Sequence, residues 1–132
     1  MSEVRVVIDH EADIVTARQM GRTVAANVGF AGSELTLIAT AISEVARNIV
    51  SYAVRGEIII DAVRRGDRVG ICIVAADEGP GIAEIEVAMR DGYSTGKSLG
   101  LGLPGAKRLM DEFEIESEVG KGTRITMRKW VL

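Results

Sequence analysis

Two side chains with hard oxygen atoms, Glu44 and Asn48, stand four residues apart in a stretch with helical periodicity. On a helix this spacing places both side chains on one side, with their β-carbons about 6 Å apart. Magnesium takes one or two hard oxygen ligands from a protein and completes its shell with phosphate oxygens and water. Asn48 suits that role, which leaves Glu44 free to orient or deprotonate a nucleophile. For an isolated pair, a solvated helix flank is the alternative, so the hypothesis depends on other motifs.

A second motif begins at Asp77, which directly follows an apolar run typical of a buried strand. A carboxylate in such a place is costly unless it meets a hydrogen-bond donor, and the amino group of adenine is a suitable donor. Gly79 and Gly81, which follow, leave room for a ligand beside the backbone. A simple turn is the alternative interpretation, because Pro80-Gly81 is a common turn pair.

The third motif is the glycine-rich run at residues 100–105, ahead of a predicted helix. It satisfies the G-x-G-x-x-G fingerprint, but that fingerprint directly follows a strand, and here a loop-like stretch precedes it. Residues 96–98 similarly imitate the end of a P-loop, whose earlier glycine would fall on Asp91. We reject both interpretations. Free amides at a helix N-terminus bind phosphate, so this start of a helix predicts a phosphate site.

The composition describes one soluble domain over residues 1–132, with 47% hydrophobic and 27% charged residues. A formal charge of −3 and an aromatic content of 4% disfavour nucleic-acid binding. No apolar run reaches the roughly 18 residues that span a bilayer, and the amino terminus does not resemble a signal peptide. We therefore predict a cytoplasmic protein that does not enter a membrane.

Three further features carry no chemistry of their own. Cys72, the single cysteine, lies in the apolar run and is predicted to be a buried core residue. His10 is the single histidine, which excludes a histidine-only metal site and predicts a surface residue at a strand end. The cluster of Arg64, Arg65 and Arg68 is predicted to be a solvated turn.

The elements that position the motifs follow from periodicity and from turn residues. Helical spacing starts after Asp13, a predicted cap, and stops before Gly29. The predicted order is a strand at 4–8, helices at 13–28 and 34–53, strands at 57–63 and 69–76, an irregular segment at 80–99 with a short helix near 85–89, a helix at 103–112, and a hairpin of 114–119 with 123–131. The strand at 69–76 is nearly all apolar, so we predict that it is central.

In this order, four segments resemble the N, G1, G2 and terminal boxes of the Bergerat (GHKL) ATP-binding fold: Glu44-Val45-Ala46-Arg47-Asn48, Asp77-Glu78-Gly79-Pro80-Gly81, Gly100-Leu101-Gly102-Leu103 and Gly122-Thr123. The resemblance covers nearly the whole chain. Within that superfamily the chain is similar to serine/threonine switch kinases of the RsbT type. The similarity lies in its length and in residues 41–44, 92–95 and 102–113. Many anti-sigma relatives carry histidine four residues after the asparagine of the N box. This chain has Tyr52 there, which favours the kinases.

The resemblance implies an α/β two-layer sandwich, with a mixed, mostly antiparallel sheet, three main helices on one face and a mobile ATP lid at about residues 82–99. It implies that Asp77 contacts adenine with help from Thr123, and that Gly79 and Gly81 line the nucleotide. Asn48 would ligate magnesium, and Glu44 would be the catalytic base. The phosphates would be held at Gly100, Leu101, Gly102 and Leu103.

The resemblance also implies partners. The substrate would be a serine or threonine of a STAS-domain antagonist or of a STAS-domain scaffold of the stressosome, and the freed kinase would activate a PP2C-type phosphatase by binding it. The alternative is an anti-sigma factor that sequesters a sigma subunit in a nucleotide-dependent manner. A histidine-kinase fragment or an ATP-driven clamp ranks lower, because both usually need further segments and the chain spans only first strand to last. Arg18 and Arg22, four apart on the first helix, are a candidate docking face, with a solvated flank as the alternative.

Overall fold

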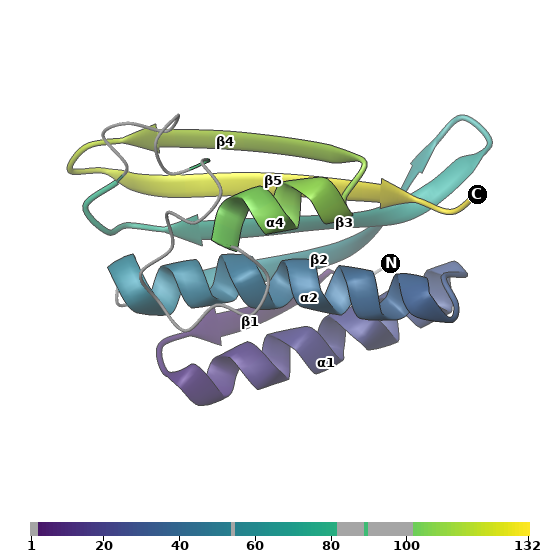
Figure 1. Cartoon of the computed structure of the whole chain (residues 1–132), viewed down its shortest axis with the longest axis horizontal. Helices are drawn as coiled ribbons and strands as arrows, with labels where there is room; N and C mark the ends of the chain where they lie inside the picture. The colour runs from purple at the N-terminus through teal and green to yellow at the C-terminus, as the bar shows by residue number, and fades with distance from the viewer. Residues whose placement is uncertain (1–2, 54, 82–88, 90–101) are drawn as a thin grey trace.

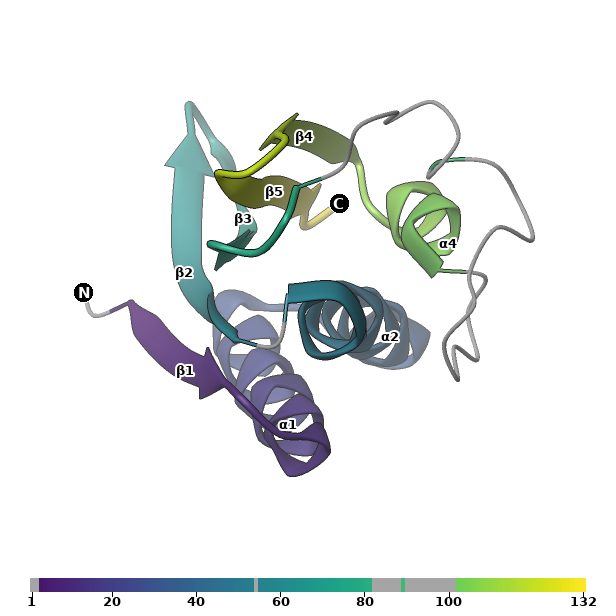
Figure 2. The ribbon, with the colours of Figure 1, turned by 90° about the vertical axis from the view of Figure 1, so that its left-hand side faces the viewer.

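The computed structural model describes residues 3–53, 55–81, 89 and 102–132. These residues form two layers, a five-stranded sheet and a layer of helices on one of its faces (Figure 1). Figure 2 shows the same layers end-on, with all the labelled helices on one side of the sheet. The strands are β1 (Val4–Ile8), β2 (Gly56–Arg65), β3 (Arg68–Asp77), β4 (Glu112–Glu118) and β5 (Gly122–Trp130). The helices are α1 (Glu11–Val28), α2 (Ser33–Asn48) and α4 (Gly102–Leu109), with the π-helical segment η1 (Ile49–Ala53) directly after α2.

The sheet order β1-β2-β3-β5-β4 makes β3 the central strand, as its apolar run predicts. Every pairing between the described strands is antiparallel. The predicted two-layer α/β fold, with helices on one face, is therefore confirmed. The parallel part of the expected mixed sheet is not found among the described strands. The predicted lid at 82–99 and its short helix lie outside the described residues, apart from Met89.

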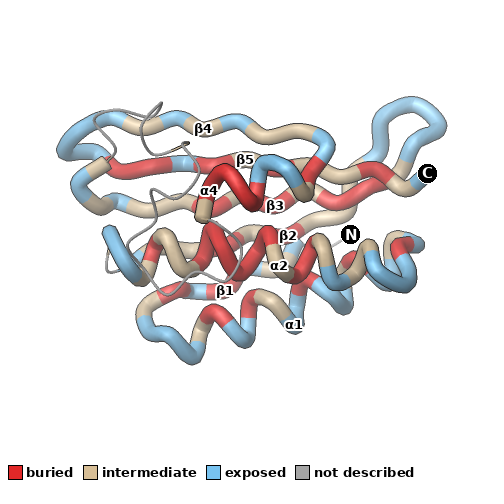
Figure 3. The backbone as a smooth tube through the Cα atoms, in the orientation of Figure 1, coloured by how far each residue is buried: buried red, intermediate tan, exposed pale blue. Residues whose placement is uncertain are grey.

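Side chains of β3 and β5 alternate between the two faces of the sheet. Ile71, Ile73 and Ala75 of β3 are buried against the helical layer, as are Ile125 and Met127 of β5. Figure 3 shows this core as the buried positions that the two layers share. By the same alternation, the side chains of Asp77, the last residue of β3, and Thr123, the second residue of β5, lie on the helix-covered face. These two residues are direct partners in the register.

The first helix begins at Glu11, two residues before the predicted start. Asp13 does cap the helix, but from inside its first turn, because its Oδ2 accepts the backbone N–H groups of Asp9 and His10, both at 2.8 Å. These two hydrogen bonds lower the pKa of the Asp13 carboxyl. Gly29 ends the helix with φ of 125°, as predicted. None of the helices in the described part of the chain is long and apolar enough to cross a bilayer.

The other two helical predictions need correction. The stretch 34–53 is not one regular helix, because α2 ends at Asn48 and the chain continues as η1. The last helix was predicted to reach residue 112, but α4 ends at Leu109. The reason is that Asp111 already pairs with β5: its N–H donates to the Arg128 carbonyl at 2.9 Å, and its carboxylate accepts the Trp130 N–H at 2.8 Å. Sheet pairing outweighs helical propensity at this point.

On the uncovered face of the sheet, two predictions need correction, one for Cys72 and one for the arginine cluster. Cys72 is half-buried beside Arg128 rather than in the core, and burial raises the pKa of its thiol, which keeps it protonated. The arginine cluster is not merely a solvated turn, because the guanidinium groups of Arg65 and Arg68 lie 4.7 and 5.0 Å from the ring centre of Trp130. His10 lies at the surface as predicted, with its side chain 80% exposed.

Candidate nucleotide-binding site

The predicted motifs meet at one end of the sandwich, on the left in Figure 1. The end of α2, the end of β3, the start of α4 and the β4–β5 hairpin all face the viewer in Figure 2. Packing of α4 against α2, and of η1 against β3, holds these ends together. Segments that are far apart in the sequence therefore contribute to one surface.

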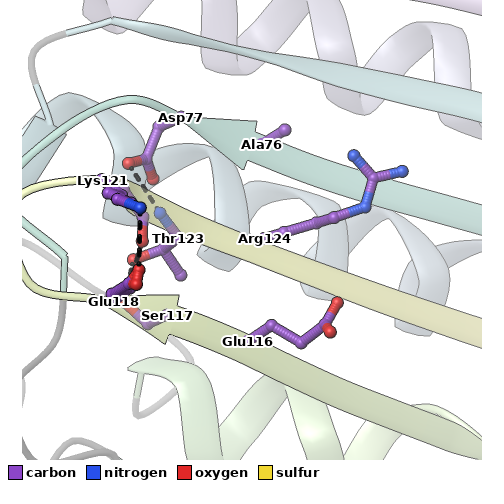
Figure 4. Close-up of a pocket in the computed structure, with 9 residues that line it drawn as sticks. Ala76, Asp77, Glu116, Ser117, Glu118, Lys121, Thr123 and Arg124 are labelled. Carbon is purple, nitrogen blue, oxygen red and sulfur yellow. Dashed lines mark hydrogen bonds and ion pairs between the residues drawn. The ribbon is translucent and has the colours of Figure 1, made fainter.

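Asp77 lies at the centre of this end of the sheet. It is paired with Gly56 of β2 on one side and with Thr123 of β5 on the other. Its Oδ1 accepts the backbone N–H of Gly79 at 2.9 Å. The same oxygen accepts the backbone N–H of Thr123 at 3.2 Å (Figure 4). Its Oδ2 makes no hydrogen bond within the described part of the chain. The carboxylate is thus fixed through one oxygen, while the other can accept a donor from a ligand.

Thr123, the partner of Asp77, is almost fully buried at 6% exposure. Its Oγ1 lies 2.8 Å from the Oγ of Ser117 on β4, and the Ser117 hydroxyl also donates to the Gly122 carbonyl at 3.1 Å. The motifs gave no reason to select Ser117. The signal that finds it is the β4–β5 register, in which Ser117 is the direct partner of Thr123.

Gly79 and Gly81, near Asp77, lie where other parts of the protein leave no room for a β-carbon. A β-carbon at Gly79 would lie 2.6 Å from the β-carbon of Ala53 in η1. At Gly81, where φ is 78°, it would clash with the Glu118 carbonyl oxygen of the hairpin. The space that was predicted for a ligand is therefore taken by the protein backbone and by Ala53. A direct role of Gly79 and Gly81 in nucleotide binding stays a prediction.

The α2 residues of the site are less exposed than an isolated helical pair would be. Glu44 is buried at 4% exposure, so the solvated-flank alternative is wrong for this residue. Asn48 is half-buried at the last position of α2. The next residue, Ile49, packs closely against Gly56, the β2 partner of Asp77. This contact places the end of α2 beside the start of β2, next to the end of β3.

The predicted phosphate site is only partly described. Gly102 is the first residue of α4 and has φ of 70°, a conformation that favours glycine. The side chain of Leu103 is buried in the core, so this residue can offer a ligand only its backbone. Gly100 and Leu101 lie outside the described residues. The start of α4 presents the backbone amides of its first turn and the positive end of a helix dipole, the features on which phosphate binding at a helix N-terminus depends.

A shallow groove with a volume of about 430 Å³ runs round the end of the strands beside Asp77 and Thr123 (Figure 4). It is open to solvent and joins both faces of the sheet, because Ala76 and Arg124 lie on the uncovered face. Its lining residues are Ala76, Asp77, Glu116, Ser117, Glu118, Lys121, Gly122, Thr123 and Arg124.

The donor set fits an adenine nucleotide with magnesium better than a metal held by protein alone. Among the described residues there is no group of three or more His, Cys, Asp or Glu side chains that could hold a metal ion. Asn48 offers one hard amide oxygen, and a magnesium ion bound with one or two protein ligands takes the rest from phosphates and water. Asp77 offers a carboxylate oxygen to an amino group, and α4 offers amides to phosphates.

Comparisons with known proteins identify the family and similar chains. Residues 9–129 match the family model of the histidine kinase-like ATPase domain. The chain is 52% identical to the serine/threonine-protein kinase RsbT of Bacillus subtilis over 121 residues, which covers 92% of this chain and 91% of that protein. It is 36% identical to the anti-sigma F factor of Thermoanaerobacter sp. over 104 residues, 74% of this chain and 71% of that protein.

A solved structure supports the fold alone. The mycobacterial sensor histidine kinase MprB superposes with a TM-score of 0.58 at 16% sequence identity, over 98% of this chain and 97% of that chain. Two proteins this far apart in sequence share the arrangement of helices and strands, while their activities are separate questions.

Proposed function

The chain belongs to the family of histidine kinase-like ATPase domains, and from this premise we propose that it is a serine/threonine protein kinase that uses ATP. The observation that carries the proposal is that only one of the two carboxylate oxygens of Asp77 accepts hydrogen bonds from the described part of the protein. One of its oxygens is fixed by two backbone amides. The other is available at the same end of the fold as the end of α2, where Asn48 is the last residue, and the start of α4 (Figure 2). The similarity to RsbT over nearly the full length of both chains supports the choice of a protein kinase.

In the proposed reaction Asp77 Oδ2 accepts a hydrogen bond from the adenine amino group, and Thr123 lines the same edge of the base. The amides of Gly102 and Leu103 hold phosphate oxygens at the start of α4. Asn48 would hold magnesium, which when bound supplies positive charge against the phosphates during transfer. These residues bind and orient the nucleotide, and such positioning accounts for most of the catalysis in phosphoryl transfer.

Glu44 is the proposed general base. It lies one turn before Asn48 on α2, so the proposed base and the proposed metal ligand project from the same side of one helix. In the transfer step a bond forms between the acceptor oxygen and the terminal phosphorus. The bond from that phosphorus to the bridging oxygen breaks, ADP leaves, and the hydroxyl proton passes to Glu44.

We further propose that the acceptor is a serine or threonine of a STAS-domain antagonist or scaffold protein, and that the kinase also binds and activates a PP2C-type phosphatase in the cytoplasm. The similarity to a serine/threonine-protein kinase supports a hydroxyl acceptor, and the resemblance to the switch kinases supports the partner class. Phosphorylation adds negative charge at the contact between the partners, which lowers the affinity for one surface and releases the kinase for another.

Label transfer tests the proposal. Purified protein is incubated with magnesium, γ-labelled ATP and a STAS-domain protein encoded beside it, and labelled serine or threonine is the expected product. Asn48→Ala removes the proposed metal ligand and is expected to reduce transfer at least a hundredfold, while the thermal unfolding midpoint without nucleotide stays near that of the wild type. Transfer at the wild-type rate by Asn48→Ala would contradict the assignment of the metal site.

The second candidate is an anti-sigma factor, which the 36% identity to an anti-sigma F factor favours. In that case nucleotide would organise a surface that sequesters a sigma subunit. The two candidates separate in one pull-down with ATP: capture of a sigma factor without label transfer supports the anti-sigma factor, and label transfer to a STAS domain without sigma capture supports the kinase.

A further inference from the structure

The C-terminal end of α4 is tied to the last residues of β5. The Nζ atom of Lys129 donates a hydrogen bond to the carbonyl oxygen of Leu109, the last residue of α4, at 3.0 Å. Just after the helix, the N–H of Asp111 donates to the Arg128 carbonyl at 2.9 Å, and its carboxylate accepts the N–H of Trp130 at 2.8 Å. Consecutive residues of β5 therefore hold this end of the helix and the chain that follows it.

Lys129 is the residue that reaches the helix itself with its side chain. It follows the buried Met127 by two residues, so its side chain starts from the helix-covered face of β5 and is half-buried there. The last carbonyl groups of a helix have no partner inside the helix, and a positive charge at this end interacts favourably with the helix dipole. The ammonium group of Lys129 meets both needs.

Most of the α4 residues that pack into the protein have small or short side chains. The buried residues of this helix are Leu103, Pro104, Gly105 and Ala106. Packed helices lock together when ridges of side chains on one enter grooves on the other, and small side chains make low ridges. The hydrogen bond from Lys129 therefore supplies a fixed point that this packing surface supplies only weakly along the helix axis.

β5 also connects the two halves of the proposed nucleotide site. At its start Thr123 pairs with Asp77, the proposed partner of adenine. Lys129 lies six residues further along, about 20 Å away, where it holds the far end of the proposed phosphate helix. With eight residues, α4 is about 12 Å long and runs back from there to the site (Figure 1). A shift at its C-terminal end therefore moves its first turn as well.

We propose that Lys129 is a positioning residue for the nucleotide phosphates: its hydrogen bond to Leu109 holds the start of α4 at the distance from Asp77 that ATP spans. A ligand that binds two places at once needs them at a matching separation. ATP uses both places, whereas adenosine uses only the adenine half, so the affinity for ATP depends on Lys129 and the affinity for adenosine does not. This inference rests on the proposed nucleotide-binding function and adds to it a residue remote from the ligand.

The test compares ATP with adenosine. Isothermal titration measures the dissociation constants of both ligands with the full chain and magnesium. Lys129→Met removes the donor and keeps a side chain of similar length, and its dissociation constant for ATP is expected to rise about tenfold while that for adenosine stays at the wild-type value. Lys129→Arg keeps a cationic donor and is expected to bind ATP within about twofold of the wild type. Lys129→Gln, which is too short to reach the carbonyl, repeats the measurement if Lys129→Met folds poorly.

Lys107→Met is the matched control, because Lys107 is an exposed residue in the last turn of the same helix. This variant removes the same positive charge from the C-terminal end of α4 and leaves the hydrogen bond from Lys129 in place. Both of its dissociation constants are expected to equal those of the wild type. A loss of ATP affinity in Lys107→Met as large as that in Lys129→Met would assign the effect to charge and overturn the inference.

Two further outcomes would also overturn the inference and leave the proposed function standing. One is an equal loss of affinity for ATP and adenosine in Lys129→Met, since a general weakening of the fold affects both ligands. The other is wild-type affinity for ATP in both Lys129→Met and Lys129→Gln. Failure of the wild-type protein to bind ATP would overturn the proposed function, and the inference with it.

Discussion

Two carboxylates on the two faces of the sheet are used in different ways. Glu112, on the uncovered face, accepts hydrogen bonds at both oxygens, from Arg65 at 2.7 Å, Trp130 at 3.1 Å and Arg128 at 3.2 Å. Asp77, on the helix-covered face, accepts two backbone N–H groups at Oδ1, while Oδ2 is available to a ligand. Burial alone does not separate the two, because both are half-buried.

The difference shows how a structural carboxylate is distinguished from a binding one. The hydrogen bond from Arg65, followed by that from Trp130, lowers the pKa of Glu112 from 4.5 to about 2, so its charge is satisfied inside the protein. Asp77 has no cationic partner among the described hydrogen bonds and ion pairs. A carboxylate that the fold fixes without saturating it is prepared for a donor from outside.

The largest expected effect comes from Asp77→Asn. Asparagine can keep the acceptor that receives the two backbone amides, but an amide NH₂ replaces Oδ2 and faces the amino group of adenine. The affinity for ATP is expected to fall about a hundredfold, since hydrogen bonds to charged groups are the stronger ones. Isothermal titration with ATP and magnesium measures this fall. Glu112→Gln is the matched control and should bind ATP like the wild type; equal losses in both variants would remove the distinction between the two carboxylates.

Gly122→Ala tests the backbone that positions Asp77. Gly122 is buried, its φ is 105°, and an added β-carbon would clash with the Asp77 carbonyl oxygen. We expect the free energy of unfolding in urea to fall by about 2 kcal/mol, with weaker ATP binding. Gly120→Ala is the control in the same turn, because φ is also positive, at 84°, but no atom lies within 4 Å of the added carbon. Its expected loss is about 1 kcal/mol, from backbone strain alone. Equal losses in the two variants would show that the clash with Asp77 is unimportant.

The smallest expected effect is the contribution of the Glu112 carboxylate to the pH dependence of stability. The pKa of Glu112 is lower in the folded protein, about 2, than its ordinary value of 4.5. Its contribution to stability is therefore complete above pH 4.5, declines as the pH falls from 4.5 towards 2, and is lost below that. Urea midpoints of the wild type and Glu112→Gln are expected to differ at pH 7 and to converge at low pH, with a smaller difference at high salt because the group is near the surface. A difference that is the same at pH 7 and pH 2.5 would contradict the role given to these hydrogen bonds.

The sequence predicted the fold well where periodicity reflects burial. The alternation at Val4, Val6 and Ile8 and the apolar run of β3 gave the first and central strands, because strand side chains alternate and a central strand is covered on its core face. Element ends were less predictable. The end of α4 depends on the pairing of Asp111 with β5, a contact between residues that are distant along the chain.

In the candidate site, too, contacts between residues that are distant along the chain could not be predicted. Glu44, Asn48 and Asp77 could be proposed from the sequence, because their residue types suit base, metal and adenine chemistry at recognisable spacings, and their roles stay predictions. Ser117 could not be proposed in this way, because a serine in a strand carries no motif. Its contact with Thr123 follows only from the β4–β5 register. Cys72 was misplaced for a similar reason: an apolar run does not say which of its residues face away from the helices.

One binding experiment tests the central claim, that the available oxygen of Asp77 recognises the amino group of adenine. Dissociation constants are measured for ATP and for purine riboside triphosphate, which lacks that amino group, with the wild-type protein and with Asp77→Asn. The wild type is expected to prefer ATP about a hundredfold, and Asp77→Asn is expected to bind the two nucleotides equally. A preference for ATP that survives in Asp77→Asn would contradict the account.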